Sequence, residues 1–514
     1  MIRRFASPSL LECQKRRAVG IAVAVAGWLV TGPVKADEPR RVGEPNVLRE
    51  PGEITQVVDA FDGDDPFDLH LSLGYETSWK SAAIRRETSI MQAGLTTGDY
   101  TSAGLNVAEY KETTSRLLTR ADIGIYRDIA LIVRMPIVLS NERELSSLDG
   151  SAGQQALVLQ GAPGEQLFRL PFKSPKRSGI EYLAVGVDAA IMNQARDRTK
   201  PTWVVGLEGR FNISEPMHAC NASTAALNGS GTQVKCANIS DVNRNGVADG
   251  GSEGNFSSAE RPSGVSRGVT GLELHSYVSR RVKYVEPYGG FRALFEFQNA
   301  SSDYGQVDLK GSLVNHPPLR GTMLMGLQVI PWEIRDRFQR LTMDFRFTGT
   351  YVSEGRDYSE LFDALGSSDA PTLRNPNYAD YMAGPMPNTS VVNPNSRRVY
   401  FTGLTDVQAH GSYTLSTSFT WQAGEFVKFN AGAAYTLTQG HYITYDQACN
   451  PDFSGDLSRS GPCHRASSSG GTNSVQGTGI PNPSFRKPIN DPGTRFRVDD
   501  LRQIDAWINA TVMF

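Results

Sequence analysis

The chain has 514 residues, of which 52 are basic and 54 acidic, with a formal net charge of −2 and a mean hydropathy of −0.33. This balance excludes a strongly basic nucleic-acid-binding protein, so no nucleic acid partner is expected. Beyond residue 36 no apolar run reaches the roughly 20 residues of a membrane-spanning helix, so a membrane protein of this composition must cross with strands.

Residues 1–36 have the form of a cleaved signal peptide. Five basic residues precede an apolar run at 18–30, and Val34 and Ala36 have the small-residue spacing that a signal peptidase recognises. The run is too short for a spanning helix, which favours cleavage after Ala36 over a retained membrane anchor. The mature chain then has 46 basic and 53 acidic residues, a net charge of −7.

Residues 37–65 are predicted to form a flexible acidic segment on the periplasmic side. The acidic tract at Asp62, Asp64 and Asp65 favours a plain linker. The alternative is a plug or a partner-docking arm, because residues 54–61 include four apolar side chains, Ile54, Val57, Val58 and Phe61.

Alternating apolar and polar residues then begin at Phe67. In residues 67–80 the apolar face consists of Phe67, Leu69, Leu71, Leu73, Tyr75, Thr77 and Trp79. Residues 117–125 and 131–139 repeat the pattern on either side of the turn Arg127-Asp128, which predicts a hairpin. A secreted β-sandwich also alternates, but its strands typically have about five or six residues, so the longer runs favour a barrel.

The same pattern recurs near 179–193, 202–213, 268–282, 285–299, 320–332, 339–352, 407–422, 426–439 and 500–514. The fold class is therefore all-β, a transmembrane antiparallel up-and-down barrel of about 12 strands, with 10 or 14 as alternatives, spanning residues 66–514. Short connections are expected at the periplasmic side. Long extracellular loops are expected near 81–110, 143–178, 214–267, 300–319, 353–406 and 440–499.

The last strand, with apolar residues at every second position up to Phe514, resembles the closing β-signal strand of bacterial outer-membrane barrels. The resemblance implies the outer membrane of a Gram-negative bacterium, with outer-membrane lipid and the barrel-insertion machinery as partners. Tryptophans at strand ends, such as Trp79, Trp203, Trp332 and Trp421, fit the aromatic girdles of such barrels, whereas Trp507 is predicted to face the lumen.

A second resemblance concerns a hairpin. Residues 179–186 (GIEYLAVG) and 201–207 (PTWVVGL) are similar to a hairpin of outer-membrane transport proteins linked to aromatic-compound uptake. The usual ending of that hairpin, Pro-Thr-Gly, is replaced here by Phe211-Asn212-Ile213-Ser214. No site residue is carried over.

Four cysteines remain after cleavage, and they form two local pairs inside predicted extracellular loops. Cys220 is expected to bond to Cys236, and Cys449 to Cys463, because an exported protein passes an oxidising periplasm. Each cross-link would contribute on the order of 3 kcal/mol. Zinc binding by these cysteines and His464 is disfavoured, because no second ligand pair has the required spacing.

The first of these loops includes a calcium-like motif. Asp241, Asn243, Asn245 and Asp249 place oxygen side chains around Gly246, as in part of a calcium-binding loop, although Ser252 stands where an EF-hand has its bidentate Glu. The alternative is an ordinary Asn/Asp/Gly turn. No other cofactor is predicted.

Strand parity predicts a charged lumen, either filled by ion pairs or wet and selective. Its predicted lining consists of Arg116, Arg120, Asp122, Arg134, Asp188, Glu208, Arg210, Glu273, His275, Arg292, Glu296, Asp344, Arg346 and Lys428.

The function expected from this pattern is a passive channel or transporter for small solutes. The alternative is a non-conducting surface barrel whose loops bind a partner, ion or envelope polymer. A barrel-type hydrolase is less favoured, because the seven histidines accompany no hydrolase motif, so no enzyme activity is predicted.

Overall fold

The computed structural model describes most of the chain after residue 53. The described residues are 54–60, 68–91, 100–222, 235–237, 256–257, 262–304, 314, 316–368, 370–374, 401–447, 449–450, 465–466, 475–476, 480–482 and 484–514.

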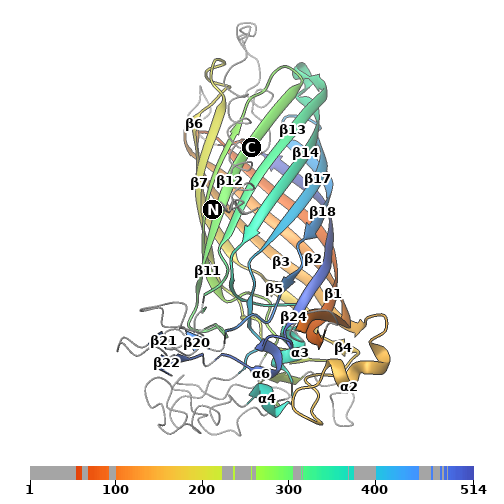
Figure 1. The fold of residues 1–514 in the computed structure, drawn as a ribbon. Coiled ribbons are helices and arrows are strands. Elements are labelled where there is room, and N and C mark those ends of the chain that lie inside the picture. Colours follow the sequence, from red (N-terminus) through yellow and green to blue (C-terminus); the bar gives the residue numbers. More distant parts are fainter. Residues whose placement is uncertain are drawn as a thin grey trace, which may run out of the picture.

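Twelve antiparallel strands close into a barrel (Figure 1). In ring order they are β1 (Leu69–Met91), β2 (Tyr100–Tyr126), β3 (Ile129–Ser147), β6 (Leu183–Met192), β7 (Thr202–Phe211), β11 (Val269–Ser279), β12 (Val285–Gln298), β13 (Arg320–Ile334), β14 (Gln339–Val352), β17 (His410–Gln422), β18 (Val427–Thr438) and β24 (Phe496–Met513). The twelve predicted strands are thus confirmed.

The first and last strands join the ring. β1 pairs with β24 in a register that runs from His70 opposite Met513 to Arg86 opposite Phe496. Beyond the last ladder pair, the backbone of Leu69 exchanges hydrogen bonds of 3.1 and 2.9 Å with that of Phe514. Closure leaves no free edge among the twelve strands, which satisfies the backbone hydrogen bonds inside a bilayer.

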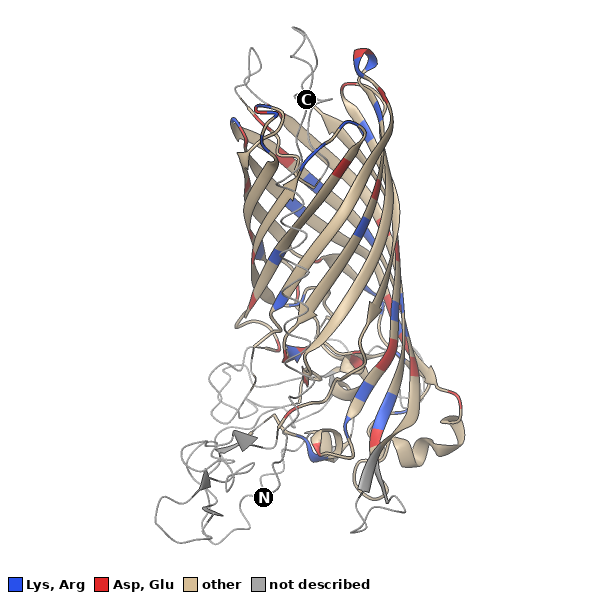
Figure 2. Cartoon of the chain, turned by 45° about the horizontal axis from the view of Figure 1, so that its top comes forward, with Lys and Arg blue, Asp and Glu red and all other residues tan. Residues whose placement is uncertain are grey.

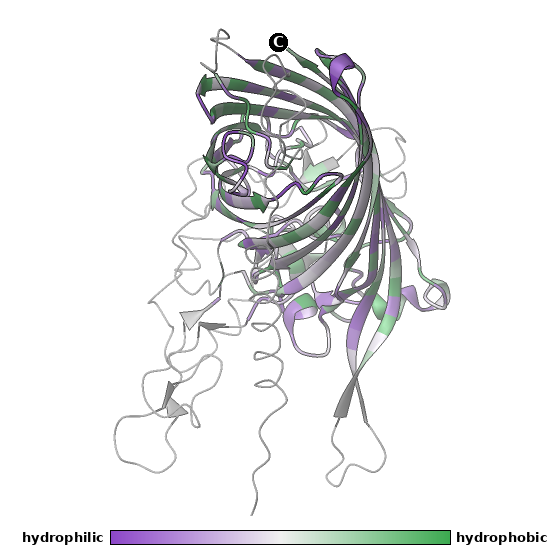
Figure 3. Cartoon of the chain, turned by 90° about the horizontal axis from the view of Figure 1, so that it is seen from above, coloured by the Kyte–Doolittle hydropathy of each residue, from purple (hydrophilic) through white to green (hydrophobic). Residues whose placement is uncertain are grey.

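Residues with apolar side chains alternate with polar ones along these strands (Figure 3). Large apolar residues are exposed on the outer face, including Leu73, Leu274, Phe291, Met323, Phe347, Leu415, Phe419 and Ile508. An exposed apolar belt around a closed barrel is the arrangement of a transmembrane barrel.

Trp507 faces inward as predicted, where its indole N–H donates to Asn430 over 2.8 Å. Among the helices of the described residues, none combines the length and apolarity needed to span a bilayer.

The wall continues well beyond the predicted strand ends. Most of the predicted loop 81–110 is strand, because β1 continues to Met91 and β2 begins at Tyr100. The reason is a change of the buried face: up to Trp79 the apolar side chains point outward, whereas Ile84 and Val107 point inward and are fully buried. A β-bulge at Ile84/Arg85 accompanies this change.

The connections sort to the two ends of the barrel. The short β2–β3, β6–β7, β11–β12, β13–β14 and β17–β18 connections lie at the end that carries the C-terminus, which we call the turn end (Figure 1). The other end is called the loop end. Small strands outside the ring are β4 (Phe172–Lys173), β5 (Arg177–Ile180), β8 (Cys220–Asn221), β9 (Lys235–Ala237), β10 (Phe256–Ser257), β15 (Gly355–Asp357), β16 (Thr405–Val407), β19 (His441–Tyr442), β20 (Cys449–Asn450), β21 (Arg465–Ala466), β22 (Val475–Gln476) and β23 (Ile480–Pro481).

The connections at the loop end fold over a second apolar core. Their helices are η2 (Ala152–Gln154), α2 (Gln155–Val158), α3 (Phe362–Gly366), α4 (Pro371–Arg374) and α6 (Lys487–Asn490), and η4 (Arg335–Arg337) lies in a turn at the other end. Leu159, Leu167, Leu361, Leu365 and Ile489 are fully or almost fully buried against the inward side chains of β1, β2 and β24. We call these packed connections the cap.

Candidate functional site

The candidate site is the lumen, where a central cluster of charges joins four strands. Arg134 on β3 and Arg210 on β7 both donate to Glu208, with Nε–O distances of 2.8 and 3.0 Å. Arg210 also binds Glu273 on β11. His275, two residues along β11, contacts Asp188 on β6 with an Nε2–Oδ1 distance of 2.9 Å. The structure thus brings together six of the predicted lumen residues.

A second group lies beside it on β2. Arg120 donates to Asp122 over 2.7 Å and stands opposite Arg134 in the β2–β3 register. Arg116 donates to Glu76 over 2.9 Å and lies 3.3 Å from Glu181. The predicted lining included Arg116 but neither of its partners. Glu76 lies on the polar face of the predicted strand 67–80, and Glu181 lies between β5 and β6.

Of the remaining predicted lining residues, Arg292 adjoins the central cluster, and the others lie apart from it. Asp344 accepts from Tyr288 over 2.6 Å and from Arg346 over 3.0 Å, so Tyr288 joins two predicted residues on β14. Glu296 lies nearer the loop end, where it accepts from Arg267 over 3.1 Å. Arg292 stands opposite His275 in the β11–β12 register, and Lys428 donates to Gln56.

The lumen wall is divided into a charged and a hydroxyl-lined part. Along β17 the inward positions are Ser412, Thr414, Ser416, Ser418 and Thr420. Their hydroxyls bond to neighbours on the next strand, as Thr414 does to Thr436 over 2.8 Å and Thr420 to Asn430. Charged residues recur along other strands of the wall (Figure 2). A solute in the lumen would therefore meet charges on one side and hydroxyls on another.

In three ion pairs of the charged part, the arginine is more exposed than its carboxylate partner. The side chains of Arg120 and Arg134 are 43% and 30% exposed, whereas their partners Asp122 and Glu208 are 13% and 5% exposed. The same contrast holds for Arg346, at 31%, over Asp344, at 9%. In these three pairs the carboxylate lies against the wall, and the guanidinium group is the more exposed partner.

Residues 54–60 lie inside the barrel at the turn end, and we call them the strap. Val57 and Val58 are buried against Ala130 on β3 and Val204 on β7, which share the inward face with Arg134 and Glu208. The backbone of Ala60 exchanges two hydrogen bonds with Arg127, of 3.0 and 2.8 Å. The sequence left both a linker and a plug open for this region, and this described part packs against the inner wall.

The strap also reaches other parts of the ring. Thr55 shares a 2.7 Å hydrogen bond with Ser279 at the end of β11, and Gln56 accepts from Lys428 on β18. β11 and β18 are five strands apart in the ring of twelve, so these contacts cross the lumen. Gly124 allows the close approach, because a Cβ there would stand 1.9 Å from the carbonyl oxygen of Asp59.

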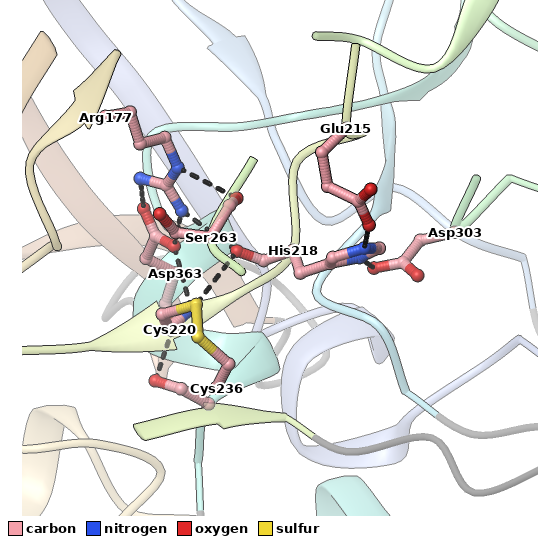
Figure 4. The surroundings of a disulfide bond; sticks show 9 residues. Arg177, Glu215, His218, Cys220, Cys236, Ser263, Asp303 and Asp363 are labelled. Atoms are coloured by element: carbon pink, nitrogen blue, oxygen red, sulfur yellow. Dashed lines mark hydrogen bonds and ion pairs between the residues drawn. A yellow bond between two sulfur atoms is a disulfide. The ribbon is translucent and has the colours of Figure 1, made fainter. Parts of the chain in front are cut away.

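At the loop end a buried ion pair ties the cap together (Figure 4). Arg177 on β5 forms two hydrogen bonds with Asp363 on α3, of 2.9 and 2.6 Å, and both side chains are almost completely buried. The backbone N–H of Cys220 donates to Asp363 over 3.0 Å. Cys220 is bonded to Cys236, one of the two expected disulfides.

A buried carboxyl in the cap predicts a pH effect. Asp406 on β16 is 2% exposed, and burial, then Asp446 and Glu354, raise its pKa from 3.8 to about 9. The folded cap therefore retains a proton that the unfolded chain releases, so cap stability should fall as pH rises from about 4 to 9, by at most about 1.4 kcal/mol per pH unit. Hydrogen exchange of the cap measured near pH 6, 8 and 10 should show this loss of protection.

The control for this effect is Asp406→Asn, which keeps a neutral side chain at every pH. Arg356 donates to the neighbouring Asp446 over 3.2 Å, and this contact should remain in the variant. We expect the variant's protection to change less with pH than that of the natural chain. An equal pH dependence in the two proteins would contradict the assignment to Asp406.

Several predicted loop residues lie outside the described part of the chain. These are the calcium-like set Asp241, Asn243, Asn245 and Asp249, and also Cys463. Cys449 begins β20, but its bond to Cys463 stays a prediction. Calcium binding likewise stays a prediction.

Comparisons with known proteins found no matching family model and no matching curated protein. Among solved structures, the chain is similar to an outer membrane channel from Pseudomonas putida F1, with 7% identity, coverage of 89% of this chain and 100% of the other, and a TM-score of 0.32. It is also similar to the CymD monoaromatic hydrocarbon channel, with 9% identity, 92% and 93% coverage and a TM-score of 0.30.

A third similar structure is the outer membrane protease OmpT from Escherichia coli, with 8% identity, coverage of 90% of this chain and 100% of the other, and a TM-score of 0.25. Channels and a protease thus appear together at the same low similarity. Identities of 7–9% and TM-scores of 0.25–0.32 do not extend to function. The expectation that the chain is not an enzyme stays a prediction.

Proposed function

We propose that the chain is an outer-membrane channel for small solutes, with a preference for anions. The exposed guanidinium groups of the lumen support this proposal most directly. Were the lumen a filled core, Arg120 and Arg134 would be as buried as Asp122 and Glu208, but they are several times more exposed. The exposure indicates a wet space whose contact surface carries hydrogen-bond donors for carboxylate or phosphate groups.

The orientation follows from the two ends of the barrel. Outer-membrane barrels place short turns in the periplasm and long loops outside, so the turn end with the strap would face the periplasm and the cap would face the exterior. An N-terminal signal peptide, removed after Ala36, would direct the export that this orientation requires. Insertion would place the exposed apolar belt in lipid.

Conductance in planar bilayers tests the proposal. Refolded protein should give steady currents, and in a KCl gradient the sign of the reversal potential should show a preference for chloride. Arg134→Gln should shift the reversal potential towards that of a cation-selective pore, because Glu208 keeps its charge while a lumen cation is lost. A silent protein would contradict the channel.

The matched control is Arg337→Gln. Arg337 is exposed in η4 at the turn end, outside the lumen, so the variant has the same net charge as Arg134→Gln. Its reversal potential should equal that of the natural chain. If both variants shift the potential equally, the lumen arginines do not determine selectivity.

A further inference from the structure

A polar pocket of about 450 Å³ lies on the outer surface of the wall at the loop end. Arg85 on β1, Gly104 and Asn106 on β2, and Arg497 and Asp499 on β24 line it together with Tyr442. The residues that alternate with them, including Ile84, Phe496 and Val498, are fully buried in the core of the cap. The pocket therefore opens on the face opposite the cap and has no part in the lumen.

The polar side chains that line the pocket hold one another in place by hydrogen bonds. Asp499 accepts from Arg85 over 3.1 Å and from Arg497 over 2.8 Å, and these two arginines stand opposite each other in the β1–β24 register. The Nε of Arg85 donates to Asn106 over 3.3 Å. Donors and acceptors thus lie side by side in fixed positions, which favours recognition of a ligand that has both.

Tyr442, the aromatic residue of the pocket, is also held in place by hydrogen bonds. The hydroxyl of Tyr442 donates to Glu87 over 3.2 Å, and Glu87 accepts from Arg495 over 2.8 and 3.0 Å. The guanidinium of Arg495 lies 4.2 Å from the centre of the Tyr442 ring. Hydrogen bonds from Arg495 lower the pKa of Glu87, which therefore stays ionised. The ring is thus held in place beside Arg495 and Arg497.

The height of the pocket above the lipid belt limits what can reach it. Arg85 is six residues beyond Trp79, the last large apolar residue on the outer face of β1 among the side chains that the structure describes. At about 3.3 Å per residue and a strand tilt near 40°, Arg85 lies roughly 15 Å above the edge of the apolar belt. On the exterior side, the groups found at that height beside a barrel are the sugars of the outer-leaflet glycolipid.

We propose that this pocket binds the saccharide part of the outer-leaflet glycolipid. Adjacent hydroxyls of a sugar both donate and accept, which matches the paired arginine, carboxylate and amide groups around Asp499. Counting Arg495 and Asp500, the site has three basic and three acidic residues, so it selects for a hydroxylated ligand more than for a pure anion. The inference rests on the orientation proposed above, and not on conduction.

Binding of three probes to detergent-purified full-length protein tests the inference. The probes are a glycolipid with lipid A and core sugars, lipid A alone, and the soluble core oligosaccharide, each measured by native mass spectrometry and by the shift of the melting temperature. Arg85→Gln combined with Arg497→Gln should weaken binding of the sugar-bearing glycolipid about tenfold, through loss of charged hydrogen bonds. Lipid A alone should bind the natural chain and the variant equally.

Two further variants separate the site from general effects of charge or folding. Gly104→Leu fills the pocket without changing any charge, since a Cβ there meets only Arg85 at 3.4 Å, and it should weaken the same probe. Lys283→Gln combined with Arg337→Gln removes two exposed cations at the turn end and should leave binding unchanged.

Other outcomes overturn the proposal. Equal glycolipid binding by the natural chain and both pocket variants would remove the site altogether. A loss seen equally with lipid A alone would assign the contact to lipid phosphates. Binding of the soluble oligosaccharide without binding of the glycolipid would make the ligand a free external sugar. None of these results depends on whether the lumen conducts.

Discussion

Deletion of the strap, residues 54–60, should raise the single-channel conductance about twofold or more, because it removes a segment that crosses the lumen at the turn end. The strap's hold on the wall is modest. It consists of a small apolar cluster around Val57 and Val58, side-chain bonds at Thr55 and Gln56, and the backbone bonds of Ala60. Planar-bilayer recordings of the deleted and natural chains measure the difference directly.

A point variant should release the strap from the lumen wall without shortening the chain. Val58→Asp places a charge among Val57, Ala130 and Val204, and burying an unpaired carboxylate there is costly enough to favour release of the strap. Its conductance should approach that of the deletion. Deleting residues 37–43 provides the control of equal length, because it leaves every described strap contact in place. If that deletion raises conductance equally, the strap does not obstruct the lumen.

Strand parity was sufficient to predict the barrel and much of its lining. Alternation identifies a strand and its two faces, and the lipid face is marked by residues such as Leu73 and Phe419. The same parity placed Arg134 and Glu208 on the inner face. It could not show that they touch, because the β3, β6 and β7 registers that bring them together are set by turns and loops.

The wall above the membrane was missed for a physical reason. Beyond Trp79 the outer face carries polar side chains such as Arg85, and the inner face packs against the cap, so apolar side chains change sides, as Ile84 and Val498 show. A sequence search that follows one continuous apolar face along β1 therefore stops at Trp79. The strap was left ambiguous because two adjacent valines, Val57 and Val58, have no period that distinguishes a buried segment from a linker.

The ion pair of the cap should show the largest effect on stability. Arg177→Met is expected to destabilise the cap by about 3–5 kcal/mol, because it leaves the buried carboxylate of Asp363 without its cation. The variant also loses the hydrogen bond from Arg177 to the carbonyl of His218, of 2.9 Å. Hydrogen exchange of α3 and limited proteolysis at the loop end would report the change, while the barrel strands should keep their protection.

A double variant tests whether charge is the cause. Arg177→Met with Asp363→Leu removes both buried charges and replaces them with apolar side chains of similar size, a change that is often close to neutral for such pairs. Part of the protection of α3 should therefore return relative to Arg177→Met alone. The backbone N–H of Cys220 would still lose its acceptor, so recovery should be incomplete. If the double variant is no better protected than Arg177→Met, an unpaired buried carboxylate is not what destabilises the cap.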